Sequence, residues 1–329
     1  MNLLFFILSY SSFFFKEKSN VSICADASLK YNSSYFDTEH FIDEFKNFSF
    51  KEPPQKFAGK GHFSVVRKSY LTDGQAVAVK EIRRFKRSDL IKELSILRIL
   101  KDVDHVVKVV GLTGNEDNPI VLYSYHSTSK NGYQNLTLSQ FRWWLKTLLE
   151  TVSEIHSHGI LHRDLNLGNI LTDFDKEELT IIDFGLADFN INGKRNNPHT
   201  GCFRLKAPEL AIERSFFDCK IDMWSIGITC LDLMINLRSN WVIKNNKMLI
   251  KKLVTYFGST NWNNFVEKYD PSYIVDHEVI GDIFELALPG NYGLITPESL
   301  DLVFKFLKLD PIERISAKEA LDHPFFYRS

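Results

Sequence analysis

The chain carries two short polar stretches, His162-Arg163-Asp164-Leu165-Asn166-Leu167-Gly168-Asn169 and Asp183-Phe184-Gly185. They place the carboxylates of Asp164 and Asp183 and the amide of Asn169 close together along the chain. One carboxylate can orient an attacking hydroxyl, while an amide and a second carboxylate can hold magnesium against phosphate groups. Two such stretches in this order predict one small site for phosphate chemistry.

The composition is that of an ordinary globular protein. The chain has 329 residues, of which 44% are hydrophobic and 25% are charged, enough to bury a substantial core. The formal net charge of −1 gives no general attraction to nucleic acid or to an anionic membrane, so neither is expected as a partner. The cysteines form no C-x-x-C pair, which argues against a zinc site and fits a reducing intracellular compartment, nuclear or cytoplasmic.

Residues 1–52 carry no motif and are expected to be an extension without an assigned fold. The first fifteen residues are largely apolar, but serines at 9, 11 and 12 interrupt them and no basic residue precedes them. They therefore fit neither a signal peptide nor a spanning helix of about 20 apolar residues, and a membrane anchor is the less favoured alternative. Residues 41–50 are expected to form a short helix that caps the following domain.

A glycine-rich stretch opens the more strongly patterned part of the chain, Ala58-Gly59-Lys60-Gly61-His62-Phe63-Ser64-Val65-Val66. Glycines permit a tight turn whose backbone N–H groups can approach phosphates without a Cβ clash, although many ordinary hairpins share this pattern. An alternating stretch, residues 75–80, then predicts a strand that ends in Lys80. Beside a glycine-rich turn, we expect the Lys80 ammonium to bind phosphates instead of standing in solvent.

A helix is predicted over residues 89–101 from its apolar spacing, with Ser88 as the N-cap. Glu93 lies on this helix and is the expected carboxylate partner of Lys80, although most helix glutamates are surface groups. A second strand at residues 120–122 should lead into a linker at 123–125, and a long helix should span residues 139–158. His156 and His158 resemble a zinc pair, but the helix-ending Gly159 favours ordinary helix C-terminal histidines.

Further landmarks follow in order, Ala207-Pro208-Glu209, Asp222-Met223-Trp224-Ser225-Ile226-Gly227, Asp310-Pro311-Ile312-Glu313-Arg314-Ile315 and His323-Pro324-Phe325-Phe326. With the stretches above, they resemble the motifs of eukaryotic-type protein kinases. The resemblance implies an α+β, bilobal protein kinase fold over residues 53–327, with a small β-rich N-lobe at about 53–125 and a larger, mainly helical C-lobe at about 126–327. It also implies that Arg314 pairs with Glu209 and that Asp222 holds the catalytic-loop backbone.

The same resemblance implies a role for each motif residue. Asp164 would orient the substrate hydroxyl, Lys80, held by Glu93, would position the ATP phosphates, and Asn169 and Asp183 would bind Mg2+. The other expected ATP contacts come from the glycine-rich loop and the linker, namely Phe57, Ala58, Gly59, Lys60, Gly61, His62, Phe63, Ser64, Val65, Tyr123, Ser124 and Tyr125.

Two positions depart from the serine/threonine kinase pattern. Asn166 replaces the catalytic-loop lysine that touches the γ-phosphate, and Cys202 replaces a threonine that contacts this lysine in the family. Asn166 is still expected to act in catalysis, as an uncharged hydrogen-bond donor, so reduced but real activity is expected. The tyrosine-kinase loop ending is absent, which favours serine/threonine hydroxyls. A pseudokinase scaffold is the alternative from another functional class.

The segment from Asp183 to Glu209 offers little for regulation by phosphorylation, because Thr200 is its single hydroxyl residue. Arg163 could receive a phosphate, but no good acceptor is expected opposite it. This pattern predicts activation by a bound regulatory partner more than by phosphorylation of the loop.

Within the class, the chain looks most like the cell-division-control kinase that fires replication origins and works with an activating regulatory subunit. This resemblance implies a role in the cell cycle or in DNA replication. Casein-kinase-2-like and cyclin-dependent-like kinases are the nearest alternatives. A basic cluster, Arg83, Arg84, Lys86 and Arg87, is most simply a solvated face, but it would also suit protein substrates with acidic flanks.

Overall fold

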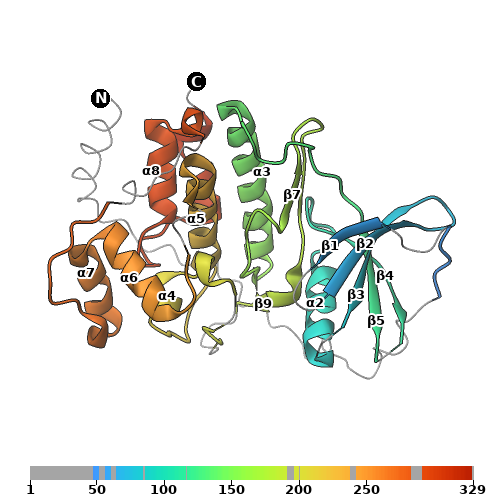
Figure 1. Ribbon diagram of the computed structural model, residues 1–329, viewed down its shortest axis with the longest axis horizontal. Coiled ribbons are helices and arrows are strands. Elements are labelled where there is room, and N and C mark those ends of the chain that lie inside the picture. Colours follow the sequence, from blue (N-terminus) through green and yellow to red (C-terminus); the bar gives the residue numbers. More distant parts are fainter. Residues whose placement is uncertain are drawn as a thin grey trace.

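The computed structural model describes residues 47–51, 56–60, 64–83, 86–115, 117–190, 196–199, 201–237, 242–282 and 291–327. A twisted sheet with one helix forms one lobe, and a larger group of helices forms the other (Figure 1). This confirms the expected two-lobed α+β architecture.

The sheet of the N-lobe is antiparallel, in the order β1-β2-β3-β5-β4. Its strands are β1 (Lys56–Lys60), β2 (Ser64–Tyr70), β3 (Ala76–Ile82), β4 (Val109–Gly114) and β5 (Pro119–Ser124). Val77 and Val79 of β3 are buried on one face, while Ala78 and Lys80 face the other way. The alternation in the sequence is therefore the alternation of the two faces of the sheet.

Helix α2 spans Arg87–Ile99 and begins two residues earlier than the apolar spacing predicts. Its N-cap is Lys86 and no side chain caps it, so the assignment of Ser88 as the cap was wrong. The helix is held instead by tertiary packing, because seven of its residues are buried, Leu90, Ile91, Glu93, Leu94, Ser95, Ile96 and Leu97.

Residues 47–51 are not helical and run beside the end of β2, so the helix expected over residues 41–50 is wrong for 47–50, while 41–46 lie outside the described residues. Phe50 forms a β-bridge with Leu71. The Phe48 ring occupies the space above Gly111, where a Cβ would lie 2.1 Å from the ring. Both aromatic rings pack on a small second core made of Leu71, Val77, Val79 and Leu122.

The helices of the C-lobe are α3 (Leu138–Ser157), α4 (Pro208–Ala211), α5 (Lys220–Ile235), α6 (Asn246–Phe257), α7 (Ser259–Tyr269), α8 (Pro297–Phe306) and α9 (Ala317–Leu321). The start of α3 is a capping box between Thr137 and Gln140, and Gly159, with φ of 64°, follows its end. The predicted long helix is thus confirmed to within a residue.

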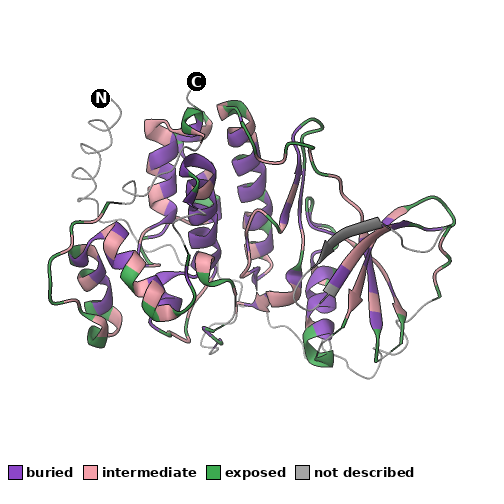
Figure 2. Cartoon of the chain, viewed as in Figure 1, coloured by how far each residue is buried: buried purple, intermediate pink, exposed green. Residues whose placement is uncertain are grey.

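Helix α5 is the centre of the C-lobe, and Figure 2 shows it buried along its length. Fifteen of its sixteen residues are buried, as expected for a helix that is apolar on every side. A Cβ at Gly227 would lie 2.7 Å from the Leu307 side chain and 2.9 Å from that of Phe306. Only glycine allows α5 to approach the end of α8 this closely.

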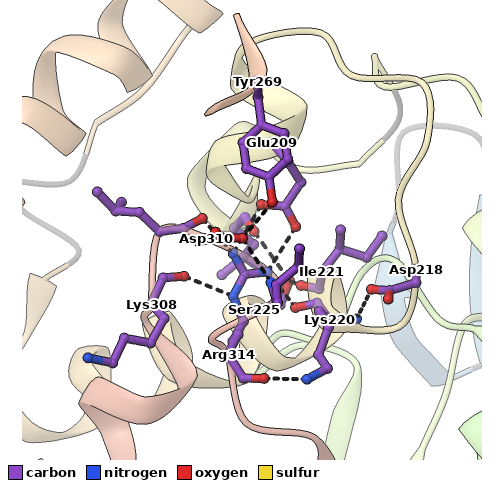
Figure 3. Close-up of polar contacts among 12 residues, drawn as sticks. Glu209, Asp218, Lys220, Ile221, Ser225, Tyr269, Lys308, Asp310 and Arg314 are labelled. Carbon is purple, nitrogen blue, oxygen red and sulfur yellow. Dashed lines mark hydrogen bonds and ion pairs between the residues drawn. The ribbon is translucent and has the colours of Figure 1, made fainter. Parts of the chain in front are cut away.

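A buried polar cluster ties α4 to the segment after α8 (Figure 3). Arg314 donates from its two terminal nitrogens to the two carboxylate oxygens of Glu209, at 2.9 and 3.0 Å. The remaining Arg314 donors are used by backbone carbonyls of Lys220, Lys308 and Leu309. The expected Arg314–Glu209 pair is therefore present.

Among the described residues, none of the helices has the length and apolar composition needed to span a bilayer.

Candidate active site

Two pairs of short strands bring the polar stretches together. Strand β6 (Ile160–Leu161) pairs with β9 (Asp188–Phe189), and β7 (Ile170–Asp173) pairs with β8 (Glu178–Ile181). The loop at 162–169 lies between β6 and β7, and the turn at 182–187 lies between β8 and β9. Because both pairs are antiparallel, the two loops emerge side by side.

Asp164 is held from within its own loop. The Asn169 side-chain amide donates to Asp164 Oδ2 at 2.8 Å and to the Asp164 carbonyl at 2.9 Å. The other carboxylate oxygen, Oδ1, is buried without a hydrogen-bond partner in the described residues. Burial raises the pKa of Asp164 above its ordinary value, and the nearby Asp183 charge adds to this. One oxygen is thus fixed and the other is left to accept a proton or hydrogen bond.

Lys80, Glu93 and Asp183 form a three-part ionic group that joins β3, α2 and the turn at 183–185. Lys80 Nζ lies 3.1 Å from Glu93 Oε1 and 3.1 Å from Asp183 Oδ1. Burial opposes the charge of Lys80, but the two carboxylates outweigh it and raise the pKa of Lys80 to about 12. Burial also opposes the charge of Asp183, yet Lys80 holds its pKa below the ordinary value. Lys80 and Asp183 are therefore both charged at neutral pH.

The backbone of the loop at 162–169 is anchored on α5 by Asp222. Its carboxylate accepts the backbone N–H groups of His162, at 2.8 Å, and Arg163, at 2.7 Å. It also contacts His156 Nε2 at 3.0 Å. Asp222 is fully buried, yet these partners hold its pKa below the ordinary value. The interpretation of His156 as a structural histidine is therefore confirmed.

Comparison with known proteins agrees with this geometry. The family profile described as the protein kinase domain matches residues 54–326. The chain belongs to the protein kinase domain family. It is also 27% identical, over 319 residues, to a probable serine/threonine-protein kinase of Dictyostelium discoideum. The match covers 93% of this chain but only 53% of that relative, so the kinase chain spans about half the length of the protein that it resembles.

Protein kinases use ATP and a divalent metal, usually Mg2+, and the residues present fit both. Mg2+ prefers oxygen ligands, and Asp183 offers a carboxylate that is 49% exposed. Asn169 uses its amide nitrogen on Asp164, which leaves its amide oxygen as a second ligand. Among the described residues, no cluster of three or more His, Cys, Asp or Glu side chains could hold a metal alone. Phosphate oxygens and water would have to complete the shell.

The phosphate loop of the kinase is only partly described. Lys60 pairs with Val65 across the β1–β2 hairpin, and the register shifts between Phe57 and Gly59. Ala58 lies on β1 and Ser64 on β2, whereas Gly61, His62 and Phe63 lie outside the described residues. The phosphate contacts expected from the glycine-rich stretch therefore stay a prediction.

Each of the three positions at 123–125, at the end of β5 and just after it, makes a different contact. Tyr123 is buried, and its hydroxyl donates to Glu93 Oε1 at 2.7 Å, so its side chain belongs to the Lys80–Glu93 group, while the expected ATP contact at this position stays a prediction. The backbone N–H of Ser124 is used by the Lys108 carbonyl at 2.8 Å. The ring of Tyr125 lies under Lys68, 4.1 Å from its ammonium. Sequence reasoning missed the Tyr123 contact.

Asn166 plays a local part in the catalytic loop. Its amide nitrogen donates to the Asp164 carbonyl at 3.1 Å, and its amide oxygen accepts the Gly168 N–H at 2.8 Å. Both ends of the side chain are therefore occupied by backbone groups beside Asp164. Asn166 thus donates a hydrogen bond without charge, as expected, and supports the loop that carries Asp164, while its expected part in catalysis stays a prediction.

Arg163 contacts the segment from Asp183 to Glu209 directly. Arg163, at φ of 69°, donates to the Asn197 carbonyl at 2.9 Å and lies 3.4 Å from Asp188. Its side chain is only 5% exposed. Cys202 is an exposed free thiol that lines a small pocket with Arg163 and Lys206. Thr200 lies outside the described residues.

Proposed function

We propose that this chain is an ATP- and Mg2+-dependent protein kinase that transfers the γ-phosphoryl group to serine or threonine hydroxyls of proteins. The single observation that carries the proposal is the Lys80–Glu93–Asp183 group formed beside an oriented Asp164. The likeness to a probable serine/threonine-protein kinase supports the choice of hydroxyl. Phosphoryl transfer needs mainly positioning and charge stabilisation, and this group supplies both.

In this mechanism the substrate hydroxyl lies against Asp164 Oδ1, the oxygen without a hydrogen-bond partner. Asp164 orients that hydroxyl and accepts its proton as the hydroxyl oxygen bonds to the γ-phosphorus and ADP leaves. Lys80, fixed by Glu93, turns toward the α- and β-phosphates. Asn169 and Asp183 would hold the metal, which would neutralise charge on the triphosphate.

The first experiment is a phosphoryl-transfer assay of the purified chain with Mg2+ and labelled ATP on an array of serine, threonine and tyrosine peptides. The matched control is Asp164→Ala. We expect transfer to serine and threonine peptides that falls by at least ~100-fold in the variant, the scale of one general base. Equal transfer by both proteins would refute the role of Asp164.

The alternative from another class is a pseudokinase that binds nucleotide and acts as a scaffold. The observations that favour it are the replacement of the catalytic-loop lysine by Asn166 and of its threonine partner by Cys202. Binding of ATP, measured by thermal shift, is common to both functions. Turnover separates them, because a scaffold would bind nucleotide without transferring phosphate to any peptide.

At a finer level, we propose a relation to the cell-division-control kinase that fires replication origins, with a role in the cell cycle or DNA replication. It is supported by the quoted motifs alone, and casein-kinase-2-like and cyclin-dependent-like kinases are the alternatives. An activating subunit is supported by this resemblance and by the single hydroxyl residue between Asp183 and Glu209. The contact that joins α2 to Lys80 is present in the described part of the chain. An assay with and without proteins that co-purify tests it, and full activity of the isolated chain would remove the subunit from the proposal.

Substrates with acidic flanks are a further part of the proposal. Arg83 and Lys86 are exposed at the junction between β3 and α2, whereas Arg84 lies outside the described residues. Exposed cations attract acidic segments, and the attraction weakens with salt. A peptide array with acidic, neutral and basic flanks, read with Arg83→Gln beside the wild-type chain, tests this. Equal rates on all three would refute it.

A further inference from the structure

The position of Tyr123 follows from the register of the sheet. Pairing of β3 with β5 sets Ala78 opposite Tyr123 and Lys80 opposite Val121. Tyr123 and Lys80 are therefore diagonal neighbours on the same face, a distance that an aromatic side chain can bridge. The Lys80 ammonium lies 5.7 Å from the centre of the Tyr123 ring. Glu93 of α2 approaches this face, so three side chains from three elements meet at one point.

At that point one carboxylate oxygen receives two donors. Glu93 Oε1 accepts the Tyr123 hydroxyl at 2.7 Å and lies 3.1 Å from Lys80 Nζ. Tyr123 is 7% exposed and Glu93 is 6% exposed, so water does not compete for either group. Burial and the Glu93 charge raise the pKa of Tyr123 well above its ordinary value, which keeps the phenol protonated as a donor.

The two donors differ in what else they bind. Lys80 is shared with Asp183, at 3.1 Å, and it must also serve the phosphates when ATP is bound. The Tyr123 hydroxyl has no second partner among the described residues. It can therefore hold Glu93 in place while Lys80 changes partners.

We propose that Tyr123 is a positioning residue for phosphoryl transfer: its hydroxyl fixes Glu93, and through Glu93 it fixes helix α2 and Lys80. This inference rests on the proposed kinase function. It also gives the chain an internal means of holding α2 in place that needs no partner protein.

The test compares Tyr123→Phe with Tyr269→Phe, its matched control. Tyr269 also donates a phenol hydrogen bond to a carboxylate, Asp310 Oδ1 at 2.6 Å, but it lies on α7. We expect Tyr123→Phe to lower kcat about tenfold with little change in KM for ATP, because a hydrogen bond to a charged group is lost while Lys80 still holds Glu93. Tyr269→Phe should leave kcat unchanged. Equal kcat values in all three proteins would overturn the proposal.

Two further readouts separate positioning from general weakening. Amide hydrogen exchange over residues 90–97 should quicken in Tyr123→Phe and not in Tyr269→Phe, and it can be measured even in a chain without turnover. Failure of the proposed function would appear as no phosphoryl transfer by the wild-type chain, with this exchange difference still present. In a Glu93→Ala background, Tyr123→Phe should cause no further loss of kcat. Additive losses would show that Tyr123 acts elsewhere and would also overturn the proposal.

Discussion

Two ion pairs in this molecule have nearly the same N···O distance but differ in burial and in how the cation is shared. The Lys80–Glu93 pair of the active site is 3.1 Å long, and the Arg314–Glu209 pair of the C-lobe is 2.9 Å long. Arg314 and Glu209 are 0% and 1% exposed, and every Arg314 donor group is used. Lys80 is 13% exposed and divides its charge between two carboxylates.

The difference shows what each pair can do. A planar guanidinium in a two-point contact is fixed in direction as well as in distance, so Arg314 can only anchor. A lysine ammonium is a compact charge on a flexible stem, and Lys80 can turn from one anion to another. The buried pair should therefore govern stability and the shared pair should govern turnover.

Removing the Arg314–Glu209 pair should have the largest effect, and this effect should be on the free energy of unfolding. Arg314→Ala leaves the Glu209 carboxylate buried and unpaired, and we expect a loss of about 3–5 kcal/mol in the free energy of unfolding. Denaturant unfolding of the purified chain measures this. If the variant is too unstable to purify, Arg314→Lys, which keeps the charge but not the two-point geometry, should still lose a substantial part of that stability. Wild-type stability in both would contradict the anchor role.

Breaking the shared pair should act on catalysis instead. Lys80→Ala is expected to lower kcat by at least ~100-fold, the scale of one preorganised charge, while the midpoint of denaturant unfolding stays near that of the wild type. Rates and unfolding midpoints measured on the same preparation check both halves. A large fall in stability with a modest loss of turnover would show that the Lys80–Glu93 pair acts mainly on stability, contrary to this prediction.

The pKa values of Asp222 and Asp164 are shifted in opposite directions, so the two carboxylates should affect stability differently as pH changes. The pKa of Asp222 is lowered, so its stabilisation is present above the ordinary carboxyl pKa and is lost as pH falls through the folded value. The pKa of Asp164 is raised, so its ionised form costs stability above the folded value, and this cost disappears below the ordinary pKa. At pH 7, Asp222→Asn should therefore lower Tm and Asp164→Asn should raise it slightly.

Melting curves between about pH 4 and 8 test the signs, because both differences from the wild-type chain should shrink toward the acid end. A higher Tm for Asp222→Asn at neutral pH would show that the charge of Asp222 is not needed to hold the loop. The acid limb of the kcat/KM profile should also lie above the ordinary range for an aspartate, since Asp164 must be ionised to accept a proton.

The smallest effect on stability is expected for an ion pair on the protein surface. Lys146 and Glu150 of α3 are 3.9 Å apart and 48% and 52% exposed. Lys146→Ala should change the free energy of unfolding by less than about 0.5 kcal/mol and leave kcat unchanged. The variant serves as the reference for the two ion pairs above. A loss comparable to that of Arg314→Ala would mean that burial is not what separates them.

The motif residues could be predicted because chemistry restricts both their types and their order. Asp164, Asn169 and Asp183 lie in two short stretches, and the β7–β8 hairpin that joins them leaves little freedom in how they meet. Lys80 and Glu93 likewise follow from a strand and the helix after it. These positions needed only patterns within short lengths of chain.

Other features depend on how elements pack and were not predicted. The contact of Tyr123 with Glu93 requires the register of β5 against β3 together with the placement of α2. The turn made by Asn166 depends on hydrogen bonds that no residue pattern specifies. The segment at 47–51 does have a signal in the sequence, since Phe48 and Phe50 alternate as strand residues do, but the same cluster of aromatic residues also fits a short helix.

That segment has a practical consequence for how the kinase is produced. The family match begins at residue 54, so a chain trimmed to that boundary would lose Phe48 and Phe50. Gly111 would then be uncovered, and the Tyr70 carbonyl would lose the Lys51 N–H that it accepts at 3.0 Å. An uncovered apolar sheet surface invites association between molecules. Recombinant preparations should therefore start upstream of residue 47 to give a soluble, monodisperse catalytic domain.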